Sequence, residues 1–234
     1  MANLLWLQGG ACSGNTMSFL NAEEPSACDL VTDFGINVLW HPSLGLELGD
    51  NVKTLLQDCV SGKIPLDIFV FEGTVVNAPN GSGNWNRFCG RPMKDWVKEL
   101  SDAAQFVVAI GDCATWGGIP AMAPNPSESV GLQFLKRDAG GSLGTGFKSK
   151  AGLPVINIPG CPAHPDWVTQ ILVAAASGRG GGHRFHQSVS RVAGRGLAFR
   201  DPARCGSGWW CGSVYGCRQG RSSQPGQAPG QRLR

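Results

Sequence analysis

The sequence lacks any long run of apolar residues. Its most hydrophobic segments, such as Phe106–Ile110, are only a few residues long, whereas a helix that crosses a bilayer needs about 20 consecutive apolar residues. The first ten residues, MANLLWLQGG, contain no basic residue and therefore no twin-arginine pair, so we expect no export signal. These absences predict a cytoplasmic protein that associates with a membrane only through its partners.

Lysine and glutamate are missing from the C-terminal part of the chain. Residues 179–234 contain ten arginines and a single acidic residue, Asp201, a net charge of +9. Residues 1–178 carry 10 basic and 16 acidic side chains, a net charge of −6. Because two such compositions rarely belong to one folded unit, we predict a folded domain over 1–178 and a separate tail over 179–234.

The tail shows neither strand alternation nor a helical apolar stripe, and its richness in Arg, Gly, Ser and Gln is typical of disorder. An Arg/Gly-rich stretch with aromatic residues can bind nucleic acid through phosphates and stacking. We instead favour an out-of-frame 3′ end of a GC-rich gene, and we expect no nucleic-acid partner. No recognisable motif surrounds its cysteines and histidines, which are His183, His186, Cys205, Cys211 and Cys217.

In residues 1–178, continuous apolar segments alternate with segments of helical periodicity. Unbroken apolar strands separated by helices are typical of a parallel sheet covered on both faces. The right-handed crossover rule then favours an α/β fold with a flavodoxin-like, doubly wound sheet. Strands are expected at 3–7, 30–39, 66–71, 105–110 and 153–158, and helices at 16–20, 46–60, 93–104 and 165–176. Residues 74–92 read as a loop, and 120–150 as an irregular stretch with a turn of helix near 130–135.

Three cysteines directly follow predicted strands. Cys12, Cys113 and Cys161 each come within about five residues of a strand end and stand near a glycine, which allows the backbone to approach a bulky ligand closely. Since the carboxyl ends of parallel strands meet at one edge of the sheet, these thiols are expected to converge there. Thiolates that arrive from several directions suit an iron–sulfur cluster. Small buried residues at tight turns are the alternative for each cysteine alone.

The segments that contain these cysteines resemble a known family. WLQGGACSGN, VFEGT, GDCATWGGIPA and PGCPAHPDW resemble, in order and spacing, the N-terminal domain of the small subunit of nickel–iron hydrogenases. The segment ACSGNTMSFLNAEEP is similar to the corresponding segment of the actinobacterial-type branch of this family, which is associated with aerobic, high-affinity hydrogen oxidation. The resemblance covers about residues 1–177. It implies a proximal 4Fe-4S cluster, a large-subunit partner that carries the nickel–iron centre, and assembly of such pairs into larger complexes.

The sequence departs from this family at one cluster position. The family usually has a second cysteine three positions after the first, followed two residues later by glutamate, and here these positions hold Asn15 and Met17. A neutral amide is a poor donor to iron, so Asn15 is a weak replacement for cysteine. The resemblance therefore implies three thiolate ligands and leaves the fourth ligand open.

A carboxylate is the better candidate for the fourth ligand, because it is anionic and donates through oxygen. We expect Asp33 to take this role, since the pattern places it on the strand next to that of Cys12. Asp29 is a weaker alternative. Asp112 is also disfavoured, because it directly precedes Cys113 and the chain would be strained if both residues bound the same cluster. A strand-end aspartate satisfied by the backbone is the competing interpretation of Asp33.

Glu72 ends a predicted buried strand and matches the strand-end glutamate that the family has at its subunit interface. Two interpretations of Glu72 are open. One is a role in interface hydrogen bonding or in a proton path, and the other is a plain solvated carboxylate. Cys59 lies on an apolar helical face and is expected in the core. His41 and His164 stand beside prolines and are expected at the surface.

We thus expect an electron-transfer subunit of a hydrogen-oxidising enzyme with no hydrogen chemistry of its own. Without the outer clusters of the family's second domain, the chain as written is expected not to pass electrons to a distant acceptor. A flavodoxin-like module that binds FMN is one alternative, although no Ser/Thr-rich phosphate loop follows the first strand. The cluster subunit of a respiratory NADH:quinone oxidoreductase is another, although the neighbouring cysteine pair of that family is absent.

Overall fold

The computed structural model describes residues 1–178, which contain a five-stranded parallel sheet. The strand order is β11–β7–β3–β1–β2, so β3, β7 and β11 extend the sheet on one side of β1 and β2 extends it on the other. This order confirms the flavodoxin-like doubly wound prediction. The strands are β1 (Ala2–Gln8), β2 (Ile36–Trp40), β3 (Ile68–Glu72), β7 (Phe106–Ile110) and β11 (Ile156–Ile158).

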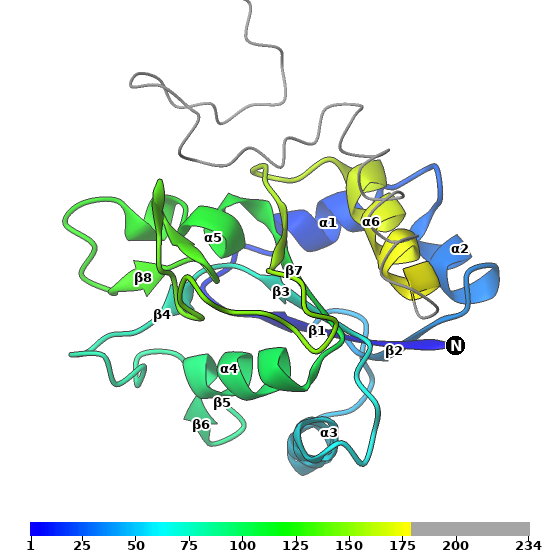
Figure 1. Cartoon of the computed structure of the whole chain (residues 1–234), viewed down its shortest axis with the longest axis horizontal. Coiled ribbons are helices and arrows are strands. Elements are labelled where there is room, and N and C mark those ends of the chain that lie inside the picture. Colours follow the sequence, from blue (N-terminus) through cyan, green and yellow to red (C-terminus); the bar gives the residue numbers. More distant parts are fainter. Residues whose placement is uncertain (179–234) are drawn as a thin grey trace, which may run out of the picture.

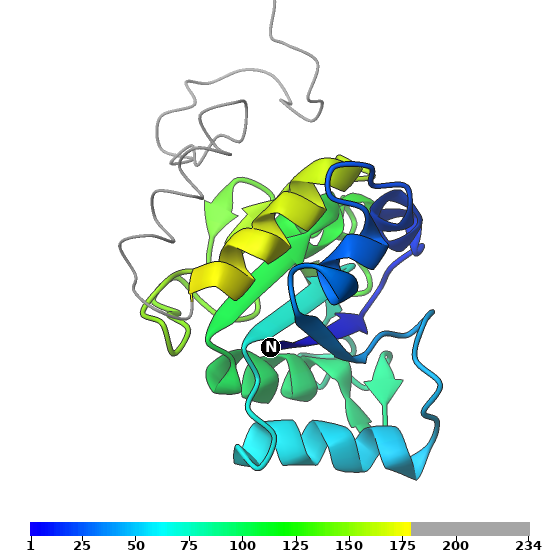
Figure 2. The ribbon, with the colours of Figure 1, turned by 90° about the vertical axis from the view of Figure 1, so that its right-hand side faces the viewer.

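Helices cover both faces of the sheet. One face is covered by α1 (Gly14–Leu20), α2 (Ala27–Thr32) and α6 (Pro165–Ser177), and the other by α3 (Asp50–Ser61) and α4 (Met93–Ala103) (Figures 1 and 2). Successive side chains of a strand point to opposite faces. In β1, Leu4 and Trp6 therefore pack towards α6, whereas Leu5 and Leu7 pack towards α3 and α4. The sheet is thus buried between two apolar cores.

The predicted strand at 30–39 is wrong in its first half. Residues 27–32 form α2, whose start is fixed by a capping box in which Ser26 and Asp29 each accept a hydrogen bond from the other's backbone N–H. This arrangement satisfies donors that a helix N-terminus leaves free. Gly35 then turns the chain with φ of +63°, and β2 begins only at Ile36.

The remaining elements follow the predictions more closely. Helix α3 ends at Gly62 as expected but begins at Asp50, so Leu46 and Leu48 lie in the preceding loop and are 95% and 78% exposed. Residues 111–116 form a short helix, α5, that the pattern did not indicate.

The long loop and the irregular stretch also contain short paired strands. The predicted helical turn near 130–135 is wrong, because this segment pairs as strands on either side of Gly131. The elements are η1 (Ile119–Ala121) and two antiparallel pairs, β4 (Val75–Val76) with β8 (Ser129–Val130) and β9 (Phe134–Leu135) with β10 (Asp138–Ala139).

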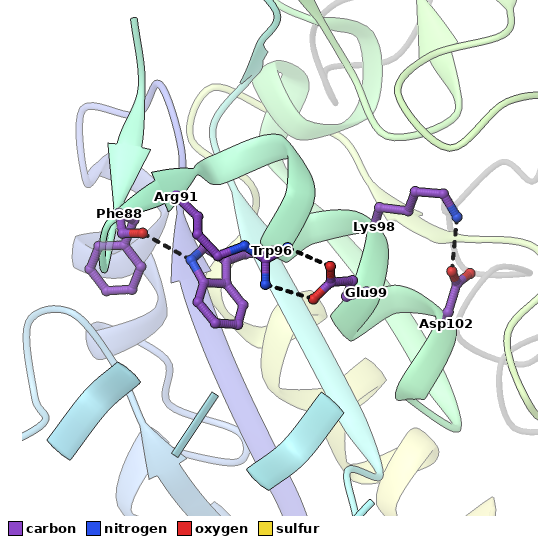
Figure 3. A network of polar contacts seen from close by, with 6 residues as sticks. All are labelled: Phe88, Arg91, Trp96, Lys98, Glu99 and Asp102. Atoms are coloured by element: carbon purple, nitrogen blue, oxygen red, sulfur yellow. Dashed lines mark hydrogen bonds and ion pairs between the residues drawn. The ribbon is translucent and has the colours of Figure 1, made fainter. Parts of the chain in front are cut away.

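A small hairpin is fixed against α4. It consists of β5 (Arg87–Phe88) and β6 (Arg91–Pro92). The Arg91 guanidinium lies 4.5 Å from the ring centroid of Trp96 and forms a two-armed ion pair with Glu99, while the Trp96 indole donates to the Phe88 carbonyl at 2.9 Å (Figure 3). A stacked guanidinium with a bidentate carboxylate holds planar groups in one geometry.

Within residues 1–178, no helix has the length and apolar content needed to span a membrane. The predicted tail lies outside the described residues, together with its cysteines and histidines.

Candidate functional site at the carboxyl edge of the sheet

The three cysteines lie in segments that leave the same edge of the sheet. Cys12 follows β1, Cys113 follows β7 and Cys161 follows β11, and all three strands run in parallel. The Cys12 and Cys161 side chains are exposed and that of Cys113 is partly buried. The thiols therefore come from three separate stretches of chain to one surface of the domain.

The pKa of the Cys113 thiol reflects its burial and the other two cysteines. Burial is the main cause that raises the pKa of the Cys113 thiol to about 11, and the nearby Cys161, Cys12 and Asp112 act in the same direction. Groups that disfavour one another's ionisation lie close together. A bound cation reverses this balance, because it stabilises thiolates that otherwise repel one another.

The turn after β7 is shaped by a close contact. Gly111 begins α5 with φ of +83°, and a Cβ at this position would lie 2.3 Å from the Asn15 side-chain nitrogen. Glycine is required here, because it adopts this backbone conformation readily and has no Cβ that would collide with Asn15. The Asn15 amide therefore packs directly against the segment that carries Cys113.

Residues 159–164, here called the Cys161 loop, are hydrogen bonded on both sides of Cys161. The Gly160 N–H donates to Asp112 Oδ1 at 2.9 Å, and the Asp112 N–H donates to the Gly160 carbonyl at 2.8 Å. On the other side, the Ala163 N–H donates to Asn15 Oδ1 at 2.8 Å. The Asp112 and Asn15 side chains thus connect the Cys161 loop to the segments that carry Cys113 and Cys12.

Glu72 ends β3 between the strands of Cys12 and Cys113 and is only 1% exposed. Its Oε1 accepts from the backbone N–H groups of Asn15 and Thr16. Its Oε2 accepts from the Thr16 hydroxyl at 2.6 Å, the Gln8 amide at 2.9 Å and the Trp6 indole at 3.3 Å. The solvated-carboxylate interpretation is therefore wrong, because this carboxylate is enclosed by donors and binds the start of α1.

His41 is buried beside this carboxylate, contrary to the predicted surface position. Burial lowers its pKa to about 4, against the opposing effect of Glu72. Its Nδ1 accepts from the Ser43 N–H at 3.0 Å, which leaves the proton of the neutral ring on Nε2, 3.5 Å from the Thr16 hydroxyl oxygen. His164 is exposed, as predicted, and Cys59 lies in the core, also as predicted. The sequence contains one indication that His41 lies near the site, because His41 directly follows a strand and therefore stands at the same edge of the sheet as the cysteines.

Asp33 does not lie with the three cysteines. It caps the end of α2 and is exposed, before β2 begins. The Ala2 N–H bonds to the Gly35 carbonyl, so this turn lies beside the start of β1, at the amino edge of the sheet. The length of β1, about 20 Å for seven residues, separates that edge from the segment of Cys12. The predicted position of Asp33 on the second strand is therefore wrong.

The residues at the carboxyl edge fit an iron–sulfur group by their chemistry. Thiolates are the usual protein ligands of such clusters, and three free cysteines follow strands that end at this edge. No three His, Cys, Asp or Glu side chains among residues 1–178 stand at mutual distances that already define a metal site. The three loops therefore supply the donor types that such a group would use, and Cys12, Cys113 and Cys161 are the residues that would hold it.

Comparison with known proteins gives the family. The model of the family described as the NADH ubiquinone oxidoreductase 20 kDa subunit matches residues 12–175. The F420 non-reducing hydrogenase II small subunit of Methanosarcina mazei is 33% identical over 75% of this chain and 48% of its own length. The periplasmic [NiFeSe] hydrogenase small subunit of Desulfomicrobium baculatum is 28% identical over 75% of this chain and 55% of its own length.

A solved structure agrees with the sequence relatives. The actinobacterial-type nickel–iron hydrogenase of Ralstonia eutropha H16 superposes with a TM-score of 0.65 at 31% identity, over 75% of this chain and 54% of that one. The chain thus spans about half the length of the curated relatives it matches. The chain belongs to the family of the NADH ubiquinone oxidoreductase 20 kDa subunit, and within it is a homologue of nickel–iron hydrogenase small subunits.

Proposed function

We propose that this chain is the electron-transfer subunit of a hydrogen-oxidising nickel–iron hydrogenase, and that Cys12, Cys113 and Cys161 hold its proximal 4Fe-4S cluster. The observation that supports this most is that Cys12, Cys113 and Cys161 each follow a strand of the parallel sheet and so leave it at the same edge. Asp33 is left out of this ligand set, because it lies at the opposite edge of the sheet.

A cluster bound here supplies one-electron redox chemistry. The chain's own residues bind and position it: three loops present the thiolates, and Glu72 fixes the start of α1 after Cys12 through its two backbone hydrogen bonds. Trp6 and the apolar core beneath the edge exclude water from the inner side of the site. A part for Glu72 in a proton path is also proposed, since the Thr16 hydroxyl links it towards His41.

The proposed partner is a large subunit that carries the nickel–iron centre, and we propose that such pairs assemble further. Electrons from that centre then enter this chain at the exposed cysteine edge. We also propose a cytoplasmic location, which fractionation of the source cells tests. The relative in D. baculatum is named periplasmic, so recovery of this chain from the periplasm contradicts that location.

Anaerobic reconstitution with iron and sulfide tests the proposal. The full chain with its cognate large subunit should contain about four irons with matching acid-labile sulfide and show a broad brown absorption band. Substitution of Cys12, Cys113 or Cys161 by serine should remove the band, whereas Cys28→Ser, an exposed cysteine on α2, should keep it. Absence of iron and sulfide in the wild-type chain refutes the proposal, and sharp flavin bands support an FMN-binding module instead.

A further inference from the structure

Two side chains, those of Asn15 and Asp112, connect the three cysteine segments through hydrogen bonds. Asn15, three residues after Cys12, is 8% exposed and bonds to the backbone of the Cys161 loop. Asp112, directly before Cys113, bonds to the same loop on the other side of Cys161. We propose that Asn15 and Asp112 are positioning residues for the cluster, which fix Cys161 relative to Cys12 and Cys113. This inference rests on the proposed function.

The geometry of Asn15 supports a specific role at this position. Its Oδ1 accepts the Ala163 N–H at 2.8 Å in a buried setting, while its nitrogen packs over the Gly111 backbone. One amide therefore contacts the segments of both other cysteines. The Asn15 backbone N–H donates to Glu72 Oε1, and this bond fixes the backbone from which the Asn15 side chain extends. At a position where the family resemblance implies a cysteine, the Asn15 amide thus joins two segments of the chain.

The geometry of Asp112 is complementary. It forms two hydrogen bonds with one residue, through its Oδ1 to the Gly160 N–H and through its own N–H to the Gly160 carbonyl. Such a pair fixes the distance and the relative orientation of the two loops. Gly160 has φ of +138°, and a Cβ there would lie 2.6 Å from the Ala163 Cα. The Cys161 loop is therefore a tight turn that depends on its neighbours for its position.

Backbone groups next to metal ligands are held by outer partners in many metal sites, and loss of such a partner typically lowers metal affinity about 10–100-fold. The contacts in the structure predict different results for the alanine variants and for the conservative variants. Asn15→Ala and Asp112→Ala remove the acceptor, whereas Asn15→Asp and Asp112→Asn keep an oxygen at the same place. Rescue by Asp112→Asn in the loaded complex, and by Asn15→Asp in the cluster-free chain, separates positioning by the hydrogen bond from a general need for the native side chain.

The experiment measures iron release from the reconstituted complex to a ferrous-iron chelator, together with the paramagnetic resonance spectrum of the reduced cluster. Asn15→Ala and Asp112→Ala should release iron at least about tenfold faster with altered spectra, and Asp112→Asn should stay near wild type. Glu128→Ala is the matched control, because Glu128 also accepts two backbone N–H groups, from Asn80 and Gly81, outside the three cysteine segments. It should release iron like the wild type.

Amide hydrogen exchange of the cluster-free chain gives a second readout. Exchange at Ala163 should rise about tenfold or more in Asn15→Ala, the factor that loss of one buried hydrogen bond produces, and return in Asn15→Asp. If the wild type binds a cluster and the alanine variants keep its iron release and spectrum, the inference is wrong while the proposed function stands. If the wild type binds no cluster, the proposed function fails, and unchanged exchange at Ala163 then overturns the positioning contact itself.

Discussion

At the scale of single residues, Glu72 shows how a carboxylate can be buried without a cation in contact. Its five donors are all neutral and come from β1 and from the start of α1. A buried charge is tolerated when hydrogen bonds replace its lost hydration. Both of its oxygens act as acceptors, and these contacts connect three elements at the edge of the sheet from which the cysteine segments leave.

Glu72→Gln should lower the free energy of unfolding by about 2–4 kcal/mol. The new amide group places N–H donors against existing donors, whichever way it is turned. Urea denaturation of the cluster-free chain measures the change. Glu47→Gln is the control, since this exposed side chain accepts only from Asn51, and its effect should stay within about 0.5 kcal/mol. Equal stabilities of the two variants contradict the account of Glu72.

His41 should make stability depend on pH. Its pKa falls from 6.5 to about 4 on folding, mainly because burial disfavours the charged ring. Between these values the unfolded chain binds a proton that the folded chain does not, so the free energy of unfolding should fall as pH drops, by about 3 kcal/mol in total. In His41→Gln this contribution is absent. The difference in stability between variant and wild type, followed from pH 7 to pH 4, should therefore change in favour of the variant; a constant difference contradicts the assignment.

At the scale of elements, the sequence predicts the central strands well and the short helices poorly. Strands β3 and β7 consist almost entirely of apolar residues, so the sequence pattern is sufficient to identify them. Helix α2 has six residues and merges with a β-branched stretch, so only its capping box indicates it. Helix α5 also has six residues and is enclosed by glycines. Short helices depend on tertiary packing, which sequence periodicity does not contain.

This difference explains which part of the site could be predicted. The convergence of the three cysteines follows from parallel strand order alone, because all carboxyl ends share an edge. The position of Asp33 depends on whether residues 27–32 are strand or helix, and the error placed Asp33 on the second strand instead of at the end of α2. The contacts of Asn15 and Asp112 depend on loop conformations at Gly111 and Gly160. No residue pattern specifies those conformations in advance.

Gly111→Ala tests the close approach at the start of α5. The variant should lose more stability than Gly62→Ala, because both glycines have positive φ but only Gly111 has a neighbour within contact of a new Cβ. The strained backbone costs about 1–3 kcal/mol in each case, and the collision with Asn15 adds an overpacking cost of about 1–3 kcal/mol at Gly111 only. Thermal or urea unfolding of the two variants measures this difference. Equal losses show that Asn15 moves aside at no cost.

At the scale of the whole molecule, large apolar side chains are exposed around the cysteine edge. They lie in segments that follow β1, β2 and β7, the same connections that form the site. A smaller exposed group, around α2 and β2, lies towards the amino edge and includes Val31 and Phe34. An apolar surface that surrounds a functional edge marks a contact with another protein. The side chains at the cysteine edge are Met17, Leu20, Leu44, Leu46, Leu48, Ile119 and Met122.

The proposed large subunit should therefore bind at the cysteine edge, and two matched substitutions test this. Leu46→Glu places a charge in the loop after β2, where the side chain is 95% exposed, and Val31→Glu places one on α2, where it is 51% exposed. Neither change touches a core, so both variants should fold as the wild type does. Burial of an unpaired charge in an apolar interface costs enough to weaken association at least about tenfold, and only Leu46→Glu should show this loss. Binding of each variant to the purified large subunit measures it. If Val31→Glu weakens association and Leu46→Glu does not, the partner covers the face of α2 instead, and electrons must enter the chain far from its three thiols.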